Sequence, residues 1–170
     1  MTNIQMTYDK TVRISPFGKC WSPNLTKSEK KFEHPMYSVT LGIDRDDPTA
    51  FDPIRKTLND FAKAFSDSLG GMKVDNKIIY ISDKGNASIR FNIRDKGQGA
   101  VPCYNEDGEP TEAPIDGDII QVKYSLAGWT MGGKAGIKVY LDSVVVVERS
   151  GKPKKEPPPE SNEDDDDWLT

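Results

Sequence analysis

The sequence predicts a mainly β domain over residues 1–150, followed by an acidic tail over residues 151–170. Several segments of the first part alternate apolar and polar side chains, and one further segment has helical periodicity. Residues 1–151 contain twenty Lys plus Arg and twenty Asp plus Glu, whereas residues 152–170 contain three lysines and seven acids. The tail therefore carries the whole net charge of −4, and the domain is neutral.

The tail is expected to be disordered. After Gly151 the composition changes to Lys, Pro, Glu, Ser, Asn and Asp, and such a segment buries too little apolar surface to offset the entropy of ordering. A second, softer break is predicted at residues 105–118, an acidic loop rich in Gly and Pro.

One segment predicts a helix of about 16 residues. Asp52 suits the N-cap, Pro53 suits the first helical position, and Gly70-Gly71 suits the end. Apolar residues recur between them at helical spacing: Ile54, Leu58, Phe61, Ala62, Phe65 and Leu69. The opposite face carries Arg55, Lys56, Asn59, Lys63 and Asp67. We therefore expect this helix to pack on a core by one face.

The remaining periodic segments predict strands. They cover residues 12–14, 37–43, 77–81, 87–94, 119–126 and 136–147, and residues 132–136 predict the tip of a β-hairpin. Five to seven short strands with one helix between early strands favour a five-stranded Greek-key barrel of the OB-fold kind. A β-sandwich is the alternative.

Several function classes are disfavoured. No apolar run approaches the ~20 residues that span a bilayer, and residues 1–10 lack the pattern of a signal peptide, so we expect a cytoplasmic protein without a membrane partner. Cys20, Cys103 and His34 form no CxxC pair or ligand cluster. We expect two ordinary thiols and a surface imidazole, with no disulfide, metal or cofactor.

Two predicted strands combine a cationic face with an apolar one. In residues 87–94 one face carries Ser88, Arg90, Asn92 and Arg94, and the other carries Ile89, Phe91 and Ile93. In residues 119–126, Gln121, Lys123 and Ser125 alternate with Val122, Tyr124 and Leu126. Residues 119–141 contain Lys123, Lys134 and Lys138 but no acid. A sheet that combines these segments would be locally positive.

Aromatic residues accompany these cations. Trp129 stands beside the Gly-rich hairpin tip, where its neighbours are too small to enclose it, and Phe17, Lys19 and Trp21 form a second mixed group. Cations for phosphates and flat rings for bases are what nonspecific single-strand binding requires. The predicted DNA-binding residues are Lys19, Trp21, Arg90, Arg94, Lys123, Trp129, Lys134 and Lys138. The alternative for residues 17–21 is that they cover one end of the barrel.

The tail ends in a distinctive motif. Asp164, Asp165, Asp166 and Asp167 precede Trp168 and Leu169, and only Thr170 follows. An aromatic–aliphatic pair on a disordered end adds nothing to a core, so it predicts a docking peptide that the aspartates steer to a basic pocket. The same tail would also compete with DNA for the cationic groove of its own domain.

The order of these features resembles the single-stranded-DNA-binding proteins of tailed bacteriophages. The resemblance rests on an early strand before Phe17 and Trp21, residues 37–41, the acidic turn 44–47, the helix, the turn 116–118, the strands 123–129 and 136–139, and the tail. It implies an OB fold, protection of single strands during replication and recombination, and recruitment of phage DNA polymerase and related proteins by the tail. This chain departs from that family in ending Trp168-Leu169-Thr170 rather than with the aromatic as its last residue.

Two other functions compete with this hypothesis. Asp44, Asp46 and Asp47, or Asp116 and Asp118, offer oxygen ligands for the magnesium of a nuclease. They lie beside Pro or Gly in predicted turns, and the chain has no GxSxG, HExxH or phosphate-loop motif, so we expect no enzyme. A protein-interaction module that never touches DNA is the other alternative. An unpaired edge strand would also allow two copies to pair as a homodimer.

Overall fold

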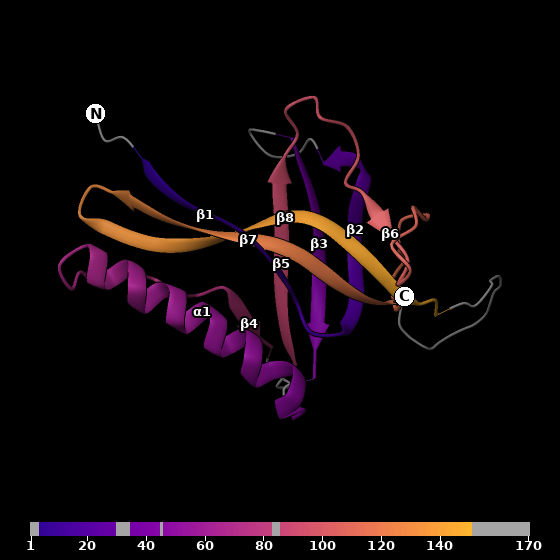
Figure 1. The fold of residues 1–170 in the computed structure, drawn as a ribbon, viewed down its shortest axis with the longest axis horizontal. Coiled ribbons are helices and arrows are strands. Elements are labelled where there is room, and N and C mark those ends of the chain that lie inside the picture. Colours follow the sequence, from indigo (N-terminus) through magenta and orange to yellow (C-terminus); the bar gives the residue numbers. More distant parts are fainter. Residues whose placement is uncertain (1–3, 30–34, 45, 83–85, 151–170) are drawn as a thin grey trace.

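The computed structural model describes residues 4–29, 35–44, 46–82 and 86–150. The elements within them are β1 (Gln5–Ile14), β2 (Gly18–Glu29), β3 (Met36–Ile43), α1 (Pro48–Ser68), β4 (Ile79–Ile81), β5 (Ala87–Arg94), β6 (Cys103–Tyr104), β7 (Ile119–Met131) and β8 (Lys134–Glu148). Figure 1 shows the long β7–β8 hairpin reaching to one side of the molecule, with α1 lying along it.

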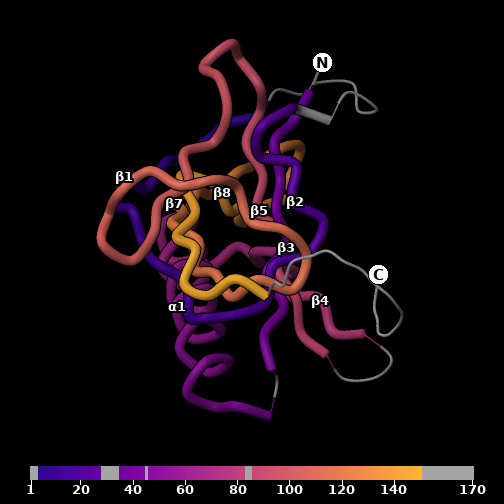
Figure 2. The backbone as a smooth tube through the Cα atoms, turned by 90° about the vertical axis from the view of Figure 1, so that its right-hand side faces the viewer, coloured from indigo at the N-terminus to yellow at the C-terminus, as the bar shows by residue number. Residues whose placement is uncertain are grey.

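Five strands of the single sheet form a ring. The hydrogen-bonded order is β7–β2–β3–β5–β8, and β8 pairs back onto β7. The β5–β8 contact is parallel and the other pairings in the ring are antiparallel. Figure 2 shows these strands around a common centre. The mainly β, OB-like fold predicted from the sequence is confirmed, and β1, β4 and β6 are added at the edges of the ring.

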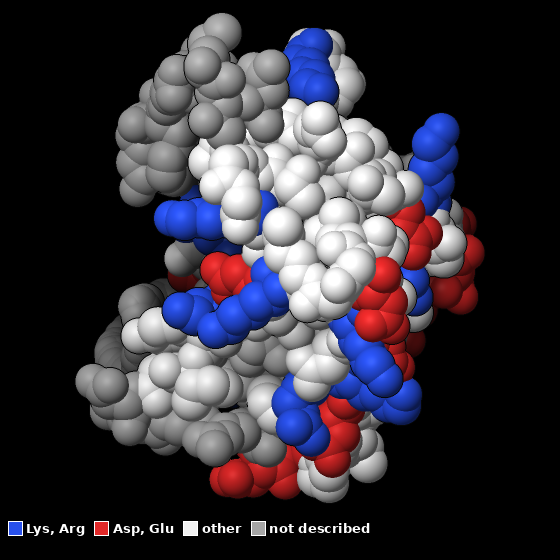
Figure 3. All heavy atoms as spheres, turned by 90° about the vertical axis from the view of Figure 1, so that its left-hand side faces the viewer, with Lys and Arg blue, Asp and Glu red and all other residues white. Residues whose placement is uncertain are grey.

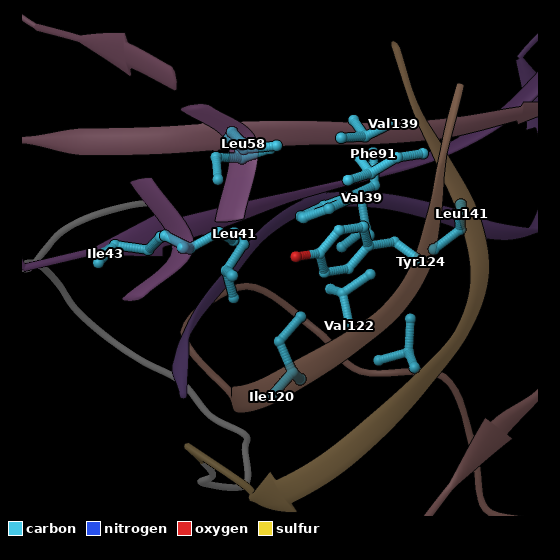
Figure 4. Packing of buried hydrophobic residues seen from close by; sticks show 14 of the residues in the cluster. Val39, Leu41, Ile43, Leu58, Phe91, Ile120, Val122, Tyr124, Val139 and Leu141 are labelled. Atoms are coloured by element: carbon cyan, nitrogen blue, oxygen red, sulfur yellow. The ribbon is translucent and has the colours of Figure 1, made fainter. Parts of the chain in front are cut away.

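The inside of the ring is filled by the apolar face of every ring strand. Tyr124 lies at its centre, 2% exposed, with its ring centroid 5.3 Å from that of Phe91. Val39, Val122 and Leu141 surround the two rings (Figure 4). Each fully buried side chain of this size contributes about 1.5–3 kcal/mol relative to exposure. This core fixes which residues of each strand face outward.

Helix α1 begins earlier than the sequence predicted. Asp47, rather than Asp52, is the N-cap: its Oδ1 accepts hydrogen bonds from the Thr49 backbone N–H at 3.0 Å and from Thr49 Oγ1 at 2.6 Å. Pro48 follows it in the first turn, so Asp47-Pro48 has the same signature as Asp52-Pro53. Pro53 is tolerated inside the helix because the hydrogen bond it removes would go to the carbonyl of Thr49, an exposed residue.

The predicted faces and end of the helix are confirmed. Ile54, Leu58, Ala62 and Phe65 are buried, while the polar residues of the opposite face are exposed. After the C-cap at Leu69, Gly70 and Gly71 adopt positive φ angles of 73° and 92°, as a helix end commonly requires.

The helix packs on the hairpin through a glycine. A Cβ atom at Gly128 of β7 would lie only 2.5 Å from Cε1 and Cζ of Phe65, so a larger residue would displace the ring. Phe65 is 7% exposed. Gly128 therefore lies on the inner face of the hairpin, and the next residue, Trp129, lies on the outer face.

The sequence failed to predict strand β2. Pro23 interrupts it, Ser22 has a positive φ of 49°, and its pairing with β3 shifts register twice, so no period-two alternation is visible. Strands β1, β7 and β8 are also longer than predicted, and the hairpin turn consists of Gly132 and Gly133, both with positive φ. Trp129 consequently lies within β7 rather than in a loop.

The cysteines are buried and form no disulfide. Burial raises the pKa of both thiols, which leaves them protonated and unreactive at neutral pH. His34 and the tail, including Asp164–Asp167 and Trp168-Leu169, lie outside the described residues. Among the described helices, none is long and apolar enough to cross a membrane.

Candidate nucleic-acid interface

The outer faces of β3 and β5 are polar and lie side by side. Along β5, Arg90 and Arg94 are exposed while Ile89 and Phe91 are buried, so the predicted alternation is confirmed. The register pairs Arg90 with Thr40 of β3 and Asn92 with Ser38. In the ring order, β3 and β5 are the second and third strands of an OB fold and β7–β8 is its last hairpin, the places where OB folds bind oligonucleotides.

An open groove of about 810 Å³ lies where this face meets the hairpin. We call it the Trp129 groove. It is lined by Ile4, Met6, Tyr8, Met36, Asn92, Ile93, Arg94, Lys96, Ser125, Trp129, Met131, Lys138 and Tyr140. Three of these residues are cations and three are aromatic, and none of the described lining residues is acidic.

The aromatic residues of this groove come from three strands. Tyr8 of β1 and Tyr140 of β8 face each other across β7, with ring centroids 5.9 Å apart. Lys138 Nζ lies 5.2 Å from the Tyr140 ring centroid, a cation–π distance. Trp129 pairs with Gly136 across the hairpin, on the same face as Lys138 and Tyr140. The groove thus combines flat rings with cations that lie among them.

None of the described residues that line the groove carries a carboxylate to balance its positive charge. Burial, followed by the like charge of Arg94, lowers the pKa of Lys138. Burial also raises the pKa of Tyr140, which keeps its hydroxyl neutral. A group whose charged form is disfavoured in this way gains most from an arriving anion. A phosphate beside Lys138 and Arg94 would supply that anion.

A second groove, which we call the Trp21 groove, lies on the β2 side of the same sheet. Its aromatic residues are exposed: Phe17 by 56%, Trp21 by 37% and Tyr80 by 66%. Its charges differ from those of the Trp129 groove, because Asp44 and Asp47 line it and Lys19 is its single cation among the described residues. It therefore offers rings without an excess of positive charge.

Arg90 stands between the two grooves. Thr40 of β3 pairs with Trp21 on one side and with Arg90 on the other, and Arg90 Nη2 donates a hydrogen bond to Ser38 Oγ at 3.3 Å. Along β5, Ser88 lines the Trp21 groove and Asn92 lines the Trp129 groove. Since residues two apart share a strand face, Arg90 connects the grooves into one surface.

Two predicted DNA-binding residues lie elsewhere. Lys123 lines a third groove together with Glu106 and Asp142, whose carboxylates offset its charge. Lys134 is exposed at the start of β8, beside the hairpin turn, and does not line any of these grooves. The structure therefore brings together Arg94, Trp129 and Lys138, places Lys19 and Trp21 in the second groove, and separates Lys123 and Lys134 from both.

Sequence reasoning missed three of the six cationic and aromatic residues of the Trp129 groove. Tyr140 follows Lys138 by two residues in a strand, so the period-two pattern that marks Lys138 also marks Tyr140. Tyr8 and Lys96 carry no comparable local signal. Tyr8 reaches the groove only because β1 pairs with β7, a contact between residues more than 100 positions apart.

Four of the five aspartates proposed as magnesium ligands have side-chain partners that explain them structurally. Asp47 caps α1, and Asp44 Oδ1 accepts a hydrogen bond from the Asp46 backbone N–H at 2.9 Å. Asp118, fully buried, accepts hydrogen bonds from the backbone N–H groups of Ile115 and Ser150 and forms an ion pair with Arg149. Within the described residues there is no cluster of three or more His, Cys, Asp or Glu that would hold a metal.

Seen from the hairpin end, the surface is not uniformly positive. Figure 3 shows Lys and Arg side chains beside Asp and Glu side chains on this face. The cationic character is therefore a local property of the groove and does not extend over the whole domain, whose charge is neutral.

The fold is similar to those of two phage proteins. It matches gp2.5, a single-stranded DNA binding protein encoded by bacteriophage T7, with a TM-score of 0.60 and 22% identity, covering 87% of this chain and 92% of that one. It also matches the single-stranded DNA-binding protein from bacteriophage Enc34 in complex with ssDNA, with a TM-score of 0.63 and 17% identity, covering 84% and 88%. No protein-family model and no curated protein matches the chain. The resemblance predicted from the sequence is confirmed at the level of the fold.

Proposed function

We propose that this chain binds single-stranded DNA without sequence preference and without catalysing a reaction. The Trp129 groove is the observation that supports this most strongly. It places Arg94, Lys96 and Lys138 among Tyr8, Trp129 and Tyr140, at the position where OB folds bind oligonucleotides. Cations that follow the phosphates and rings that stack on bases bind any sequence, because every base has a π-face.

The finer parts of the proposal concern the biological setting. Residues 1–150 form the DNA-binding domain, which protects single strands during phage replication and recombination in the host cytoplasm. Residues 151–170 recruit replication proteins such as the DNA polymerase through Asp164–Asp167 and Trp168-Leu169. The fold shared with two phage single-stranded-DNA-binding proteins supports the first part, and the composition of the tail supports the second.

The decisive experiment is a fluorescence titration with a dT oligonucleotide at several salt concentrations. We expect quenching, and a log–log salt slope of roughly −2 if the three groove cations each neutralise one phosphate, at about −0.7 per contact. Arg94→Ala/Lys138→Ala should weaken binding and flatten the slope. The matched control, Arg55→Ala/Lys63→Ala on the exposed face of α1, removes the same charge from residues that do not line the groove.

One outcome would reject the groove as the binding site, and another would reject DNA binding itself. An equal loss in both double variants would show that net charge, rather than the groove, governs binding. Absence of quenching in the unmodified chain would favour the protein-interaction module. That alternative draws support from the Trp21 groove, whose exposed rings and two aspartates suit a protein surface with apolar and basic residues.

A further inference from the structure

We propose that Gly136 is a positioning residue that holds the indole of Trp129 flat on β8, so that one ring face alone is open to a nucleobase. Gly42 contacts the Nε1–Cδ1 edge of Trp21 in the second groove. This inference rests on the proposed function for its DNA-binding consequence. The position of the rings themselves can be tested without DNA.

The contact between Gly136 and Trp129 leaves no room for a side chain. A Cβ atom on Gly136 would lie 2.5 Å from Cζ2, 2.6 Å from Cε2 and 2.7 Å from Nε1 of Trp129. Three adjoining ring atoms at nearly equal distances place that point above the ring plane, because in the plane a point equidistant from them would lie much closer. The Nε1–Cε2–Cζ2 edge of the indole therefore lies across Gly136, with the glycine on one side of the ring plane.

Backbone conformation does not explain this glycine. Gly136 is buried and is the third residue of β8, it pairs regularly with Trp129 of β7, and its φ is not in the positive range that other residues avoid. A glycine inside a strand lowers stability and commonly marks a close approach by another group. The approaching group here is the indole.

The second tryptophan has a similar neighbour. A Cβ atom on Gly42 of β3 would lie 2.8 Å from Nε1 and 3.0 Å from Cδ1 of Trp21. Gly42 also lacks a positive φ, and it lies on the strand next to that of Trp21. Both tryptophans among the described residues thus lie against a glycine of the neighbouring strand, one in each groove.

A ring with one face covered by backbone can accept one base. It cannot insert between two stacked bases, as the apolar wedges of duplex-kinking proteins do. The geometry therefore suits capture of bases that are already unstacked, and it fixes the plane in which the captured base lies. Loss of the glycine should tilt the ring and remove that platform.

The test uses full-length chains in which Trp129 is the only tryptophan, with Trp21 and Trp168 replaced by Phe. Gly136→Ala should shift the Trp129 emission and increase its quenching by acrylamide before DNA is added. It should weaken dT binding several-fold, as we also expect for Trp129→Ala in the chain with all three tryptophans. The double variant Gly136→Ala/Trp129→Ala should bind no more weakly than Trp129→Ala alone.

The matched control is Gly128→Ala. It adds the same methyl group one residue from Trp129 but toward Phe65 on the inner face, so it should lower the melting temperature without changing the Trp129 emission or the dT affinity of the folded protein. If the Gly136→Ala protein does not fold, Gly42→Ala can be tested in a chain whose only tryptophan is Trp21. The distances between Gly42 and Trp21 are longer, so an added methyl group is easier to accommodate there.

Unchanged emission and affinity in Gly136→Ala, or additive losses in the double variant, would overturn the inference. If the unmodified chain does not bind dT, the proposed function fails, and the emission and acrylamide measurements still decide whether the glycine positions the ring.

Discussion

The Trp129 groove and the Trp21 groove contain similar rings but opposite charge balances. Each has a tryptophan against a glycine, and each has two further aromatic residues. The Trp129 groove adds three cations and no acid among its described residues, whereas the Trp21 groove adds Lys19, Asp44 and Asp47. Because DNA brings one phosphate with every base, we expect the charges to decide which rings would be the main platform for the proposed binding.

The largest expected effect comes from reversing the charge of the Trp129 groove. Arg94→Glu/Lys138→Glu should lower dT affinity by roughly 100-fold at low salt, because it converts two attractive phosphate contacts into repulsive ones. Lys19→Glu in the Trp21 groove should cost less than tenfold by the same reasoning. Fluorescence anisotropy with a labelled dT oligonucleotide measures both.

A matched control makes this comparison independent of net charge. Arg55→Glu/Lys63→Glu changes the charge of the exposed face of α1 by the same amount. Equal losses in the two double variants would contradict a special role for the Trp129 groove, and a larger loss in Lys19→Glu would reverse the ranking of the grooves.

Truncating the two tryptophans should give the next largest effect. Trp129→Ala should cost about 1–3 kcal/mol in dT binding if a base stacks there. Trp21→Ala should cost less, about 1 kcal/mol or below, because the carboxylates beside it disfavour the accompanying phosphate. Isothermal titration calorimetry on both variants tests the difference, and equal costs would show that the charge balance does not rank the rings.

The pH dependence of binding should reveal Lys138. Burial and Arg94 lower its pKa below the ordinary value of 10.5, so its charged form is disfavoured in the free protein. This cost to folding stability is fully present below the lowered pKa and disappears as the pH rises toward 10.5. Phosphate favours the charged form, so dT affinity should fall as the pH rises through the lowered pKa.

Lys138→Arg supplies the control, because a guanidinium stays charged throughout this range. Its dT affinity should decline less between about pH 7 and 10 than that of the unmodified chain. Parallel pH profiles for the two proteins would assign the decline to other groups.

The smallest expected effect comes from removing negative charge from the Trp21 groove. Asp44→Asn removes one carboxylate from the Trp21 groove and keeps an oxygen that accepts the hydrogen bond from the Asp46 backbone N–H. Affinity for dT should rise by about 0.3 kcal/mol, less than twofold, the size typical of an exposed charge. Asp67→Asn on the exposed face of α1 is the control, and an equal rise there would assign the gain to net charge.

Local periodicity predicted the parts of the fold that depend on neighbouring residues. The faces of β5 and of α1 follow from patterns of two and 3.6 residues. The predicted start of α1 was wrong because Asp47-Pro48 and Asp52-Pro53 carry the same signal. Which of the two aspartates caps the helix depends on whether Ala50 can be buried in the core. Strand β2 was missed because its pairing is irregular around Ser22 and Pro23. Its neighbouring strands, rather than a local alternation in its own sequence, determine that pairing.

The sequence predicted the types of residue in the candidate site better than it predicted which of them lie together. Arg94, Trp129 and Lys138 meet in one groove because β5, β7 and β8 are neighbours in the ring, and no local pattern contains that information. The glycines around Trp129 suggested a loop. In the structure Gly128 and Gly136 lie in paired strands, where their small size admits two aromatic rings.

The adjacent residues Gly128 and Trp129 commit the hairpin to one register. Gly128 admits Phe65 on the inner face, and Trp129 belongs to the groove on the outer face. Inserting or deleting one residue earlier in β7 would exchange the two faces of the strand. The same change would then remove both the contact between α1 and Gly128 and the Trp129 ring from the groove. A length change in this strand therefore keeps both contacts when it comes in steps of two residues or beyond Trp129 toward the turn, and a change of one residue needs a compensating β-bulge like those in the β7–β8 pairing.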